Sequence, residues 1–181
     1  MKSDDELTGY HEAGHAVAAV LLGIGLQYEG VTIAADAAKG YAGFTHAVTH
    51  TGMSERTLGV YALAGEAAQR VFQPRCFYGF GGFLRSGCAD DYKAFARYMK
   101  VKGHGANDMS RLVRRYQRAA RGFVCEHWEN VERVASALLE HETLDSIEVH
   151  QLVHIDKGKM ATLIEKEYRR SALCGGGGMR V

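Results

Sequence analysis

Apolar residues recur at helical spacing over most of the chain. In Ser54–Phe72 and Asn107–Leu139 they return every three or four positions, as in a helix with one buried face. The second stretch is expected to form one long helix or two in near continuity, and the chain's one proline, Pro74, to close the first. Further helices are predicted from Ser3 or Asp4 to the glycines at 23 and 25, from Asp90 or Asp91 onward, at Asp145–Val153 and at Met160–Ala172.

Two short stretches favour β-strands instead. Val31–Ile33 and Tyr41–Val48 are rich in β-branched and aromatic residues and lie on either side of a turn expected at Gly40. The pattern therefore predicts a mainly α fold with a small β hairpin or sheet. The glycine-rich residues 174–181 can bury little and are expected to be a disordered tail.

Composition narrows the class of protein without naming a partner. A chain of 181 residues fits one domain, and 22 Lys+Arg against 21 Asp+Glu leaves no basic excess, so no nucleic acid is expected. The arginine-rich segment 111–121 is accordingly interpreted as a solvated helix face. The longest apolar run, Ala16–Leu26, is about half the length of a membrane-spanning helix, which predicts no transmembrane segment and a cytoplasmic protein.

The spacing of the cysteines indicates neither a metal site nor a disulfide framework. The four cysteines form no CxxC pair, so neither a zinc ribbon nor a compact disulfide framework is indicated. They are interpreted as reduced and mostly buried thiols: Cys76, Cys88, Cys125 and Cys174.

The first predicted helix carries the motif HEAGH. His11 and His15 are four positions apart, so on a helix both imidazoles can reach one metal ion. Glu12, on the neighbouring face, can then act as a general base without being a ligand. Gly14 weakens the helix by about 1 kcal/mol relative to alanine, which indicates that substrate or a crossing segment approaches the backbone closely there. The motif predicts one catalytic Zn²⁺ per chain.

The third protein ligand is not determined by spacing. The continuation HExxHxxGxxH is excluded, because Ala18 and Leu21 occupy its glycine and histidine positions. Glu66 is the nearest acid on a following helix, whereas Asp90 and Asp91 compete from the start of a later one. All three stay open at this point.

Four blocks of sequence suggest a family. They are "YHEAGHAVAA" from Tyr10, "LAGEAAQRVF" from Leu63, "SGCADDYKAFARYM" from Ser86 and "ALLEHETL" from Ala137. In this order they resemble the peptidase domain of FtsH-type ATP-dependent zinc metalloproteases. The resemblance implies a helical zincin-type metallopeptidase domain over residues 1–153, and residues 154–173, beyond the matched blocks, are interpreted as a C-terminal helical extension of it.

The resemblance also implies roles for individual residues. The family's zinc-binding aspartate lies in a TGAxxDL segment, and the matching position in "SGCADDY" is Asp91. His11, His15 and Asp91 would then bind zinc, with Glu12 as the catalytic base. Gln69 stands where the family usually carries a glutamate. The implied activity is zinc-dependent cleavage of unfolded or extended polypeptides.

A substrate-binding strand is implied beside the metal. Strand addition would bind an extended peptide through its main chain, and the expected contacts are Val31, Ile33, Gly40, Tyr41 and Phe44. For Val31, Ile33 and Phe44, plain core packing is the alternative interpretation. His46 or His50 could donate to the oxyanion of the tetrahedral intermediate, although a packed or solvated histidine is the simpler interpretation.

The chain departs from the family in one large respect. It contains no GxxxxGK phosphate loop, so the resemblance is to a stand-alone peptidase domain without the AAA ATPase module. A separate ATPase or unfoldase, and assembly into a homo-oligomer such as a hexamer, are partners implied by the family. The alternative function is a catalytically silent zinc protein that acts as a binding or regulatory module. Glu12 argues against it, because a structural zinc site needs no base.

Overall fold

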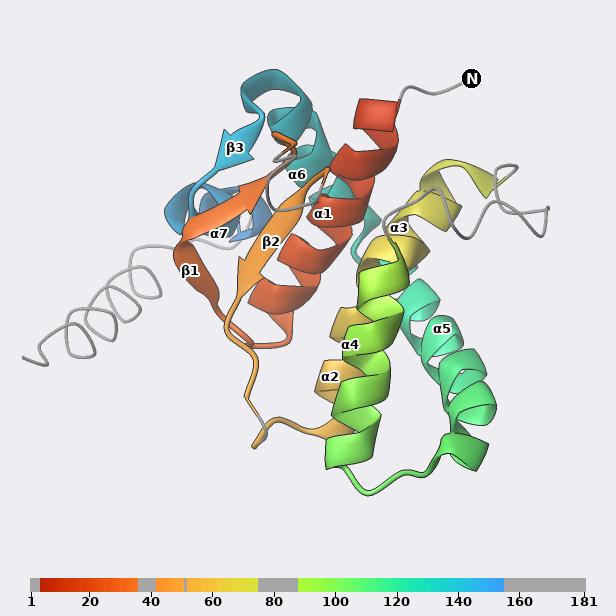
Figure 1. Cartoon of the computed structure of the whole chain (residues 1–181). Coiled ribbons are helices and arrows are strands. Elements are labelled where there is room, and N and C mark those ends of the chain that lie inside the picture. Colours follow the sequence, from red (N-terminus) through yellow and green to blue (C-terminus); the bar gives the residue numbers. More distant parts are fainter. Residues whose placement is uncertain (1–3, 36–41, 51, 75–87, 155–181) are drawn as a thin grey trace, which may run out of the picture.

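A computed structural model describes residues 4–35, 42–50, 52–74 and 88–154, which form a mainly helical fold with a small antiparallel sheet (Figure 1). This confirms the predicted fold class at that level. The helices are α1 (Asp4–Leu21), α2 (Glu55–Ala62), α3 (Ala64–Phe72), α4 (Cys88–Val101), α5 (Met109–Glu126), α6 (Trp128–His141) and α7 (Ser146–His154), with a 3₁₀ turn, η3 (Ala106–Asp108), before α5. The strands are β1 (Leu26–Thr32), β2 (Phe44–Ala47) and β3 (Thr143–Leu144). The predicted helix at 160–172, the turn at Gly40 and the tail at 174–181 lie outside the described residues.

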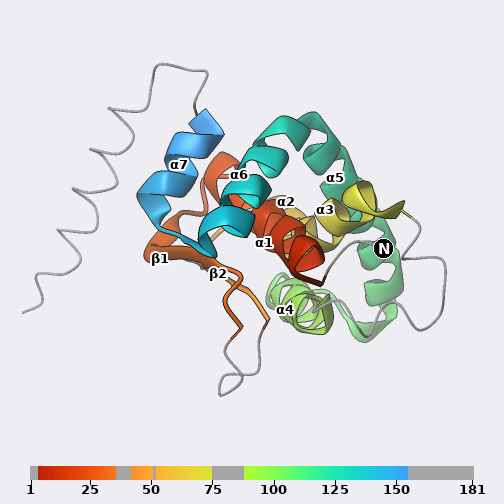
Figure 2. The same ribbon diagram turned by 90° about the horizontal axis from the view of Figure 1, so that it is seen from above.

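Helix α1 runs through the middle of the molecule, packed against α3 and α6 (Figures 1 and 2). Tyr10 stacks on Phe72 with ring centroids 3.6 Å apart and lies 5.5 Å from the ring of Trp128. A Cβ at Gly14 would lie 2.6 Å from the carbonyl oxygen of Ala64, so the glycine allows α1 and α3 to cross closely. A crossing segment therefore explains Gly14. Within the described ranges, no helix combines the length and apolar character required to cross a bilayer.

The single helix predicted over Ser54–Phe72 is wrong, because the chain breaks at Leu63 into α2 and α3. Leu63 has φ −114° and ψ 8°, outside the helical region, and its side chain is buried in the core. The break lets α2 pack against α4 and α5 while α3 turns to pack against α1. Tertiary packing, rather than a local breaker residue, thus divides this segment.

Two other helix boundaries differ from the expectation. The stretch 107–139 forms two helices that meet at His127, which was one of the two predicted alternatives. Asp108 precedes α5 but does not cap it, since its carboxylate accepts from the backbone N–H of Gly105 (3.3 Å) and pairs with Arg111. Helix α4 includes Cys88, so Asp90 and Asp91 lie inside its first turn and neither is the capping residue.

The three strands are ordered β2-β1-β3, and both pairings are antiparallel. Strand β3 has only two residues and was not predicted. Val31, in the central strand, is fully buried and pairs with both neighbours, and the N–H of Ile33 donates to Glu142 (2.8 Å). The interpretation of Val31 as core is therefore the better one, and the edge available beside α1 belongs to β2.

Candidate metal centre

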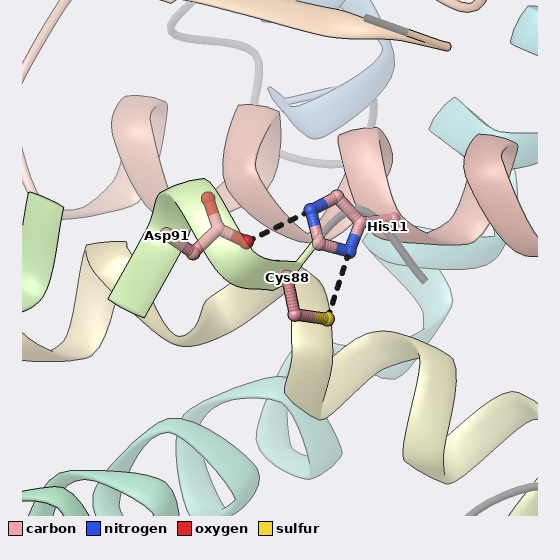
Figure 3. Close-up of side chains that lie close together, drawn as sticks. All are labelled: His11, Cys88 and Asp91. Carbon is pink, nitrogen blue, oxygen red and sulfur yellow. Dashed lines mark hydrogen bonds and ion pairs between the residues drawn. The ribbon is translucent and has the colours of Figure 1, made fainter. Parts of the chain in front are cut away.

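Three predicted ligands converge on one point between α1 and the first turn of α4. The Nε2 atoms of His11 and His15 lie 3.2 Å apart. Asp91 Oδ2 lies 3.0 Å from Nε2 of His11 and 3.2 Å from Nε2 of His15. Figure 3 shows the carboxylate of Asp91 facing the imidazole of His11. The structure thus brings Asp91 next to His11 and His15, which precede it in the chain by 80 and 76 residues.

The spacing of these atoms fits a small divalent cation. Two ligands at 2.0 to 2.1 Å from a tetrahedral zinc ion are separated by about 3.3 Å. The three observed separations fall within a few tenths of an ångström of that value. In the described part of the chain, Asp91 Oδ2 is buried and accepts no hydrogen bond of good geometry, despite the two nitrogens beside it. A metal ion at the common point would satisfy all three donor atoms together, which one shared proton cannot do.

A backbone carbonyl on the Nδ1 side of His15 orients its imidazole ring. Its Nδ1 lies 3.0 Å from the carbonyl oxygen of Tyr61, and a carbonyl can only accept, so the proton is on Nδ1. The lone pair of Nε2 is then directed at the centre, as in most histidine ligands.

Gly65 makes room for both imidazoles. A Cβ at this position would lie 2.5 Å from Nε2 of His15 and 2.7 Å from Nε2 of His11. Any side chain there would push the rings away from their common point. Sequence reasoning missed this residue, and the only signal was a glycine inside a predicted helix.

Cys88 forms a second grouping with two of the same residues. The donor atoms of His11, Cys88 and Asp91 lie within 4.8 Å of one another and could hold a metal ion. However, Cys88 Sγ lies 4.0 Å from Nδ1 of His11, on the opposite edge of the ring from Asp91 (Figure 3). The tighter set of donors is therefore His11, His15 and Asp91, with Cys88 behind His11.

Glu12 lies beside the centre under the edge of the sheet. Its side chain is 7% exposed, and its Oε2 accepts a hydrogen bond from the hydroxyl of Thr45 in β2 (2.7 Å). A Cβ at Gly43 would lie 2.9 Å from Cγ of Glu12, so the chain entering β2 passes directly over this carboxylate. Thr45 and Gly43 were not singled out from the sequence, which carries no local signal for either contact.

The two alternative acids are engaged elsewhere. Glu66 is buried at 2% exposure, forms an ion pair with Arg70 and accepts from the hydroxyl of Tyr92 (2.6 Å). Asp90 is exposed and pairs with Lys93 (2.8 Å). Neither shares the point at which the histidines converge.

The electrostatics of the centre are those of a buried anion held by imidazoles. Burial alone would raise the pKa of Asp91, but its electrostatic interactions with the imidazoles of His15 and His11 hold that pKa well below its ordinary value. Burial likewise favours a low pKa for His11, yet its interactions with Asp91 and Cys88 raise that pKa well above its ordinary value. The metal-free centre therefore favours protons where a cation would bind, and metal binding should displace them.

The residues predicted to bind the oxyanion or the substrate are not among the three converging donors. His46 packs edge-on against Phe44 at 4.8 Å, and His50 is exposed beyond the end of β2, so the oxyanion role stays a prediction. Phe44 is 44% exposed on β2, whereas Gly40 and Tyr41 lie outside the described residues. The arginines of segment 111–121 are exposed on α5, as expected of a solvated face.

Comparison with known proteins adds no assignment. The sequence matches no model of a protein family and no curated protein. The resemblance to FtsH-type peptidases is carried by the four sequence blocks alone, and the metal centre by the convergence of His11, His15 and Asp91.

Proposed function

We propose that this chain is a zinc-dependent endopeptidase that hydrolyses peptide bonds in unfolded or extended polypeptides. The observation that carries the proposal is the convergence of His11 Nε2, His15 Nε2 and Asp91 Oδ2 within 3.2 Å of one another. Glu12, adjacent to His11 on the same helix, supplies a carboxylate that a purely structural zinc site would not use. The sequence blocks support a zincin-type domain of the FtsH peptidase kind.

The roles of the residues follow from their positions. His11, His15 and Asp91 would hold one zinc ion, leaving one position open. Zinc bound there supplies a Lewis acid for the substrate carbonyl and lowers the pKa of water. Glu12 accepts the proton of the attacking water and returns it to the leaving amine. The hydroxyl of Thr45 holds Oε2 of Glu12, so that Oε1 is the oxygen available for the proton.

The substrate would lie along β2. Because β1 is paired on both sides, β2 is the strand edge next to Glu12, and an extended peptide added there would pass the catalytic carboxylate. Main-chain pairing tolerates many sequences, which suits a degradative peptidase. Phe44 offers an exposed aromatic surface on this edge, and Gly40 and Tyr41, which lie outside the described residues, stay predicted substrate contacts.

Delivery and assembly are further parts of the proposal. The 181 residues contain no GxxxxGK phosphate loop, and a separate ATPase or unfoldase that supplies unfolded substrates is proposed on the resemblance. A homo-oligomer, a hexamer by analogy, and a cytoplasmic location are proposed on the resemblance. Each is independent of the chemistry at Glu12.

The test combines metal analysis with a cleavage assay on an unfolded, fluorescently labelled polypeptide. Glu12→Gln should retain zinc and lose activity by about 100-fold or more, since general base catalysis contributes on that order. Asp91→Ala should lose zinc and activity together, whereas Asp90→Asn, one residue away but exposed, should change neither.

Two outcomes would contradict the proposal. Undiminished cleavage by Glu12→Gln would remove the assigned base. A wild-type protein that binds zinc tightly but cleaves no polypeptide would instead support the silent zinc-binding module.

A further inference from the structure

The two histidines of the metal centre are supported differently on the sides away from it. Nδ1 of His15 faces a backbone carbonyl at 3.0 Å, whereas Nδ1 of His11 faces the thiol of Cys88 at 4.0 Å. Cys88 Sγ in turn lies 3.6 Å from Oε1 of Gln69. Nε2 of Gln69 lies 3.1 Å from the carbonyl oxygen of Leu7, on α1 one turn before His11. A continuous chain of polar contacts thus leaves His11, crosses α4 and α3, and returns to α1.

The donors and acceptors in this chain can be assigned in only one consistent order. The carbonyl of Leu7 can only accept, so the amide nitrogen of Gln69 faces it and the amide oxygen faces Cys88. That oxygen also can only accept, so the thiol hydrogen of Cys88 points to it. The sulfur is left as an acceptor for Nδ1–H of His11, which puts the lone pair on Nε2, the nitrogen that faces Asp91.

We propose that Cys88 and Gln69 are positioning residues that hold His11 in the tautomer and ring orientation needed to bind the metal. The proposal rests on the proposed metal-binding role of His11 and deepens it. Cys88 is 1% exposed and Gln69 2%, so water does not compete for these contacts. Partners of this kind commonly change metal affinity by about 10- to 100-fold. Because sulfur is a weak acceptor at a long distance, the expected effect is at the lower end.

The first measurement is zinc affinity by competition with a coloured chelator. Cys88→Ala removes the thiol, and Gln69→Met keeps the length of the side chain but removes the amide. Each should weaken zinc binding by about tenfold. Cys88 and Gln69 act through one chain of contacts. The double variant should therefore lose no more zinc affinity than the single variant that binds zinc more weakly. Cys125→Ala is the matched control, since that thiol is exposed at the end of α5 and should leave affinity unchanged.

The second measurement separates positioning from general loss of structure. In the zinc-loaded protein, the Nδ1–H signals of His11 and His15 can be followed by proton–nitrogen NMR. Cys88→Ala should shift the His11 signal and speed its exchange with water, while the His15 signal, bonded to Tyr61, stays where it is. Cys88→Ser retains a hydroxyl that can donate and accept, and should recover part of the lost affinity. It also provides a variant if the alanine form folds poorly.

Several results would overturn the inference: single-variant affinities within twofold of wild type, additive losses in the double variant, or equal changes at both histidines. Absence of zinc binding by the wild-type chain would remove both this inference and the proposed function. A wild-type chain that shows the expected affinities and NMR shifts but no peptide cleavage would leave the positioning role in place and contradict only the peptidase.

Discussion

Two carboxylates that each have a buried oxygen, Glu66 on α3 and Asp91 on α4, are both candidates by sequence spacing for the third metal ligand. Each has one oxygen that, within the described residues, accepts no hydrogen bond of good geometry. Their partners differ. Glu66 forms an ion pair with Arg70 and accepts the hydroxyl of Tyr92, whereas Asp91 Oδ2 faces two imidazoles.

The difference lies in whether the compensating charge is permanent. A guanidinium is charged at every physiological pH, so Glu66 is neutralised by the protein itself. An imidazole is charged only when protonated, so the anion at Asp91 needs either protons or a metal ion to compensate its burial. Burial and an unsatisfied oxygen therefore do not identify a ligand by themselves. The nature of the neighbouring groups does.

The largest expected effect is on zinc affinity, which should distinguish Asp91 from Glu66. Asp91→Asn keeps the shape of the side chain but removes its charge. Structural zinc sites with four protein ligands are worth about 10–16 kcal/mol, or roughly 2.5–4 kcal/mol per ligand, so losing Asp91 should weaken binding by roughly 100- to 1,000-fold. Glu66→Gln should bind zinc within about threefold of wild type, because that carboxylate is outside the donor set. Zinc titration of both variants decides the comparison, and the reverse pattern would make Glu66 the ligand.

The second prediction concerns the free energy of unfolding, which Glu66→Gln should lower although it leaves zinc binding nearly unchanged. Glu66→Gln leaves the guanidinium of Arg70, whose side chain is 36% exposed, beside a neutral amide. Because the exposed part of Arg70 stays hydrated, the free energy of unfolding should fall by about 2 kcal/mol, less than the roughly 3–5 kcal/mol for a fully buried pair. Urea unfolding of the metal-free protein measures it. A loss below 1 kcal/mol would show that the Glu66–Arg70 pair is not what compensates this carboxylate.

The third prediction tests the backbone beside the centre. Gly65→Ala would place a Cβ 2.5 Å from Nε2 of His15 and 2.7 Å from Nε2 of His11, so zinc affinity should fall by about tenfold or more as the rings move. The neighbouring Glu66–Tyr92 bond should persist, since that side chain leaves α3 in another direction. Gly122→Ala, on α5 with open space around it, is the control and should at most stabilise its helix by about 1 kcal/mol. Unchanged zinc affinity in Gly65→Ala would contradict the assigned centre.

The sequence predicts the local part of the centre well. His11, Glu12 and His15 lie on one helix, so their relation depends only on helical geometry. The position of Asp91 depends on how α4 packs against α2 in the folded chain, and sequence spacing alone does not distinguish Asp91 from Asp90 and Glu66. The resemblance selected it, and the structure places it beside the two histidines.

What the sequence could not predict depends on packing between distant segments. The apolar pattern runs through Leu63 without interruption, so nothing local indicates that α2 and α3 diverge there. Cys88, Gly65 and Thr45 reach the centre from three different elements, and none belongs to a pattern of its own. The two-residue strand β3 is too short to show alternation.

The smallest expected effect concerns a third carboxylate, Glu55, which lies 3.8 Å from the guanidinium of the largely exposed Arg115 and has no place in the centre. Its oxygens accept from the hydroxyl of Tyr116 (2.6 Å) and from Nε2 of His104 (2.9 Å), and these bonds hold the pKa of Glu55 below its ordinary value. A lowered folded-state pKa adds stability that is present above about pH 4.3 and is lost as the pH falls through the folded pKa. Glu55→Gln should therefore lower the free energy of unfolding by about 1 kcal/mol at pH 7, and the difference from wild type should shrink as the pH falls below about 4. Urea unfolding across this pH range measures the difference, with exposed Asp90→Asn as the control, and parallel curves at all pH values would show that the charge of Glu55 contributes nothing.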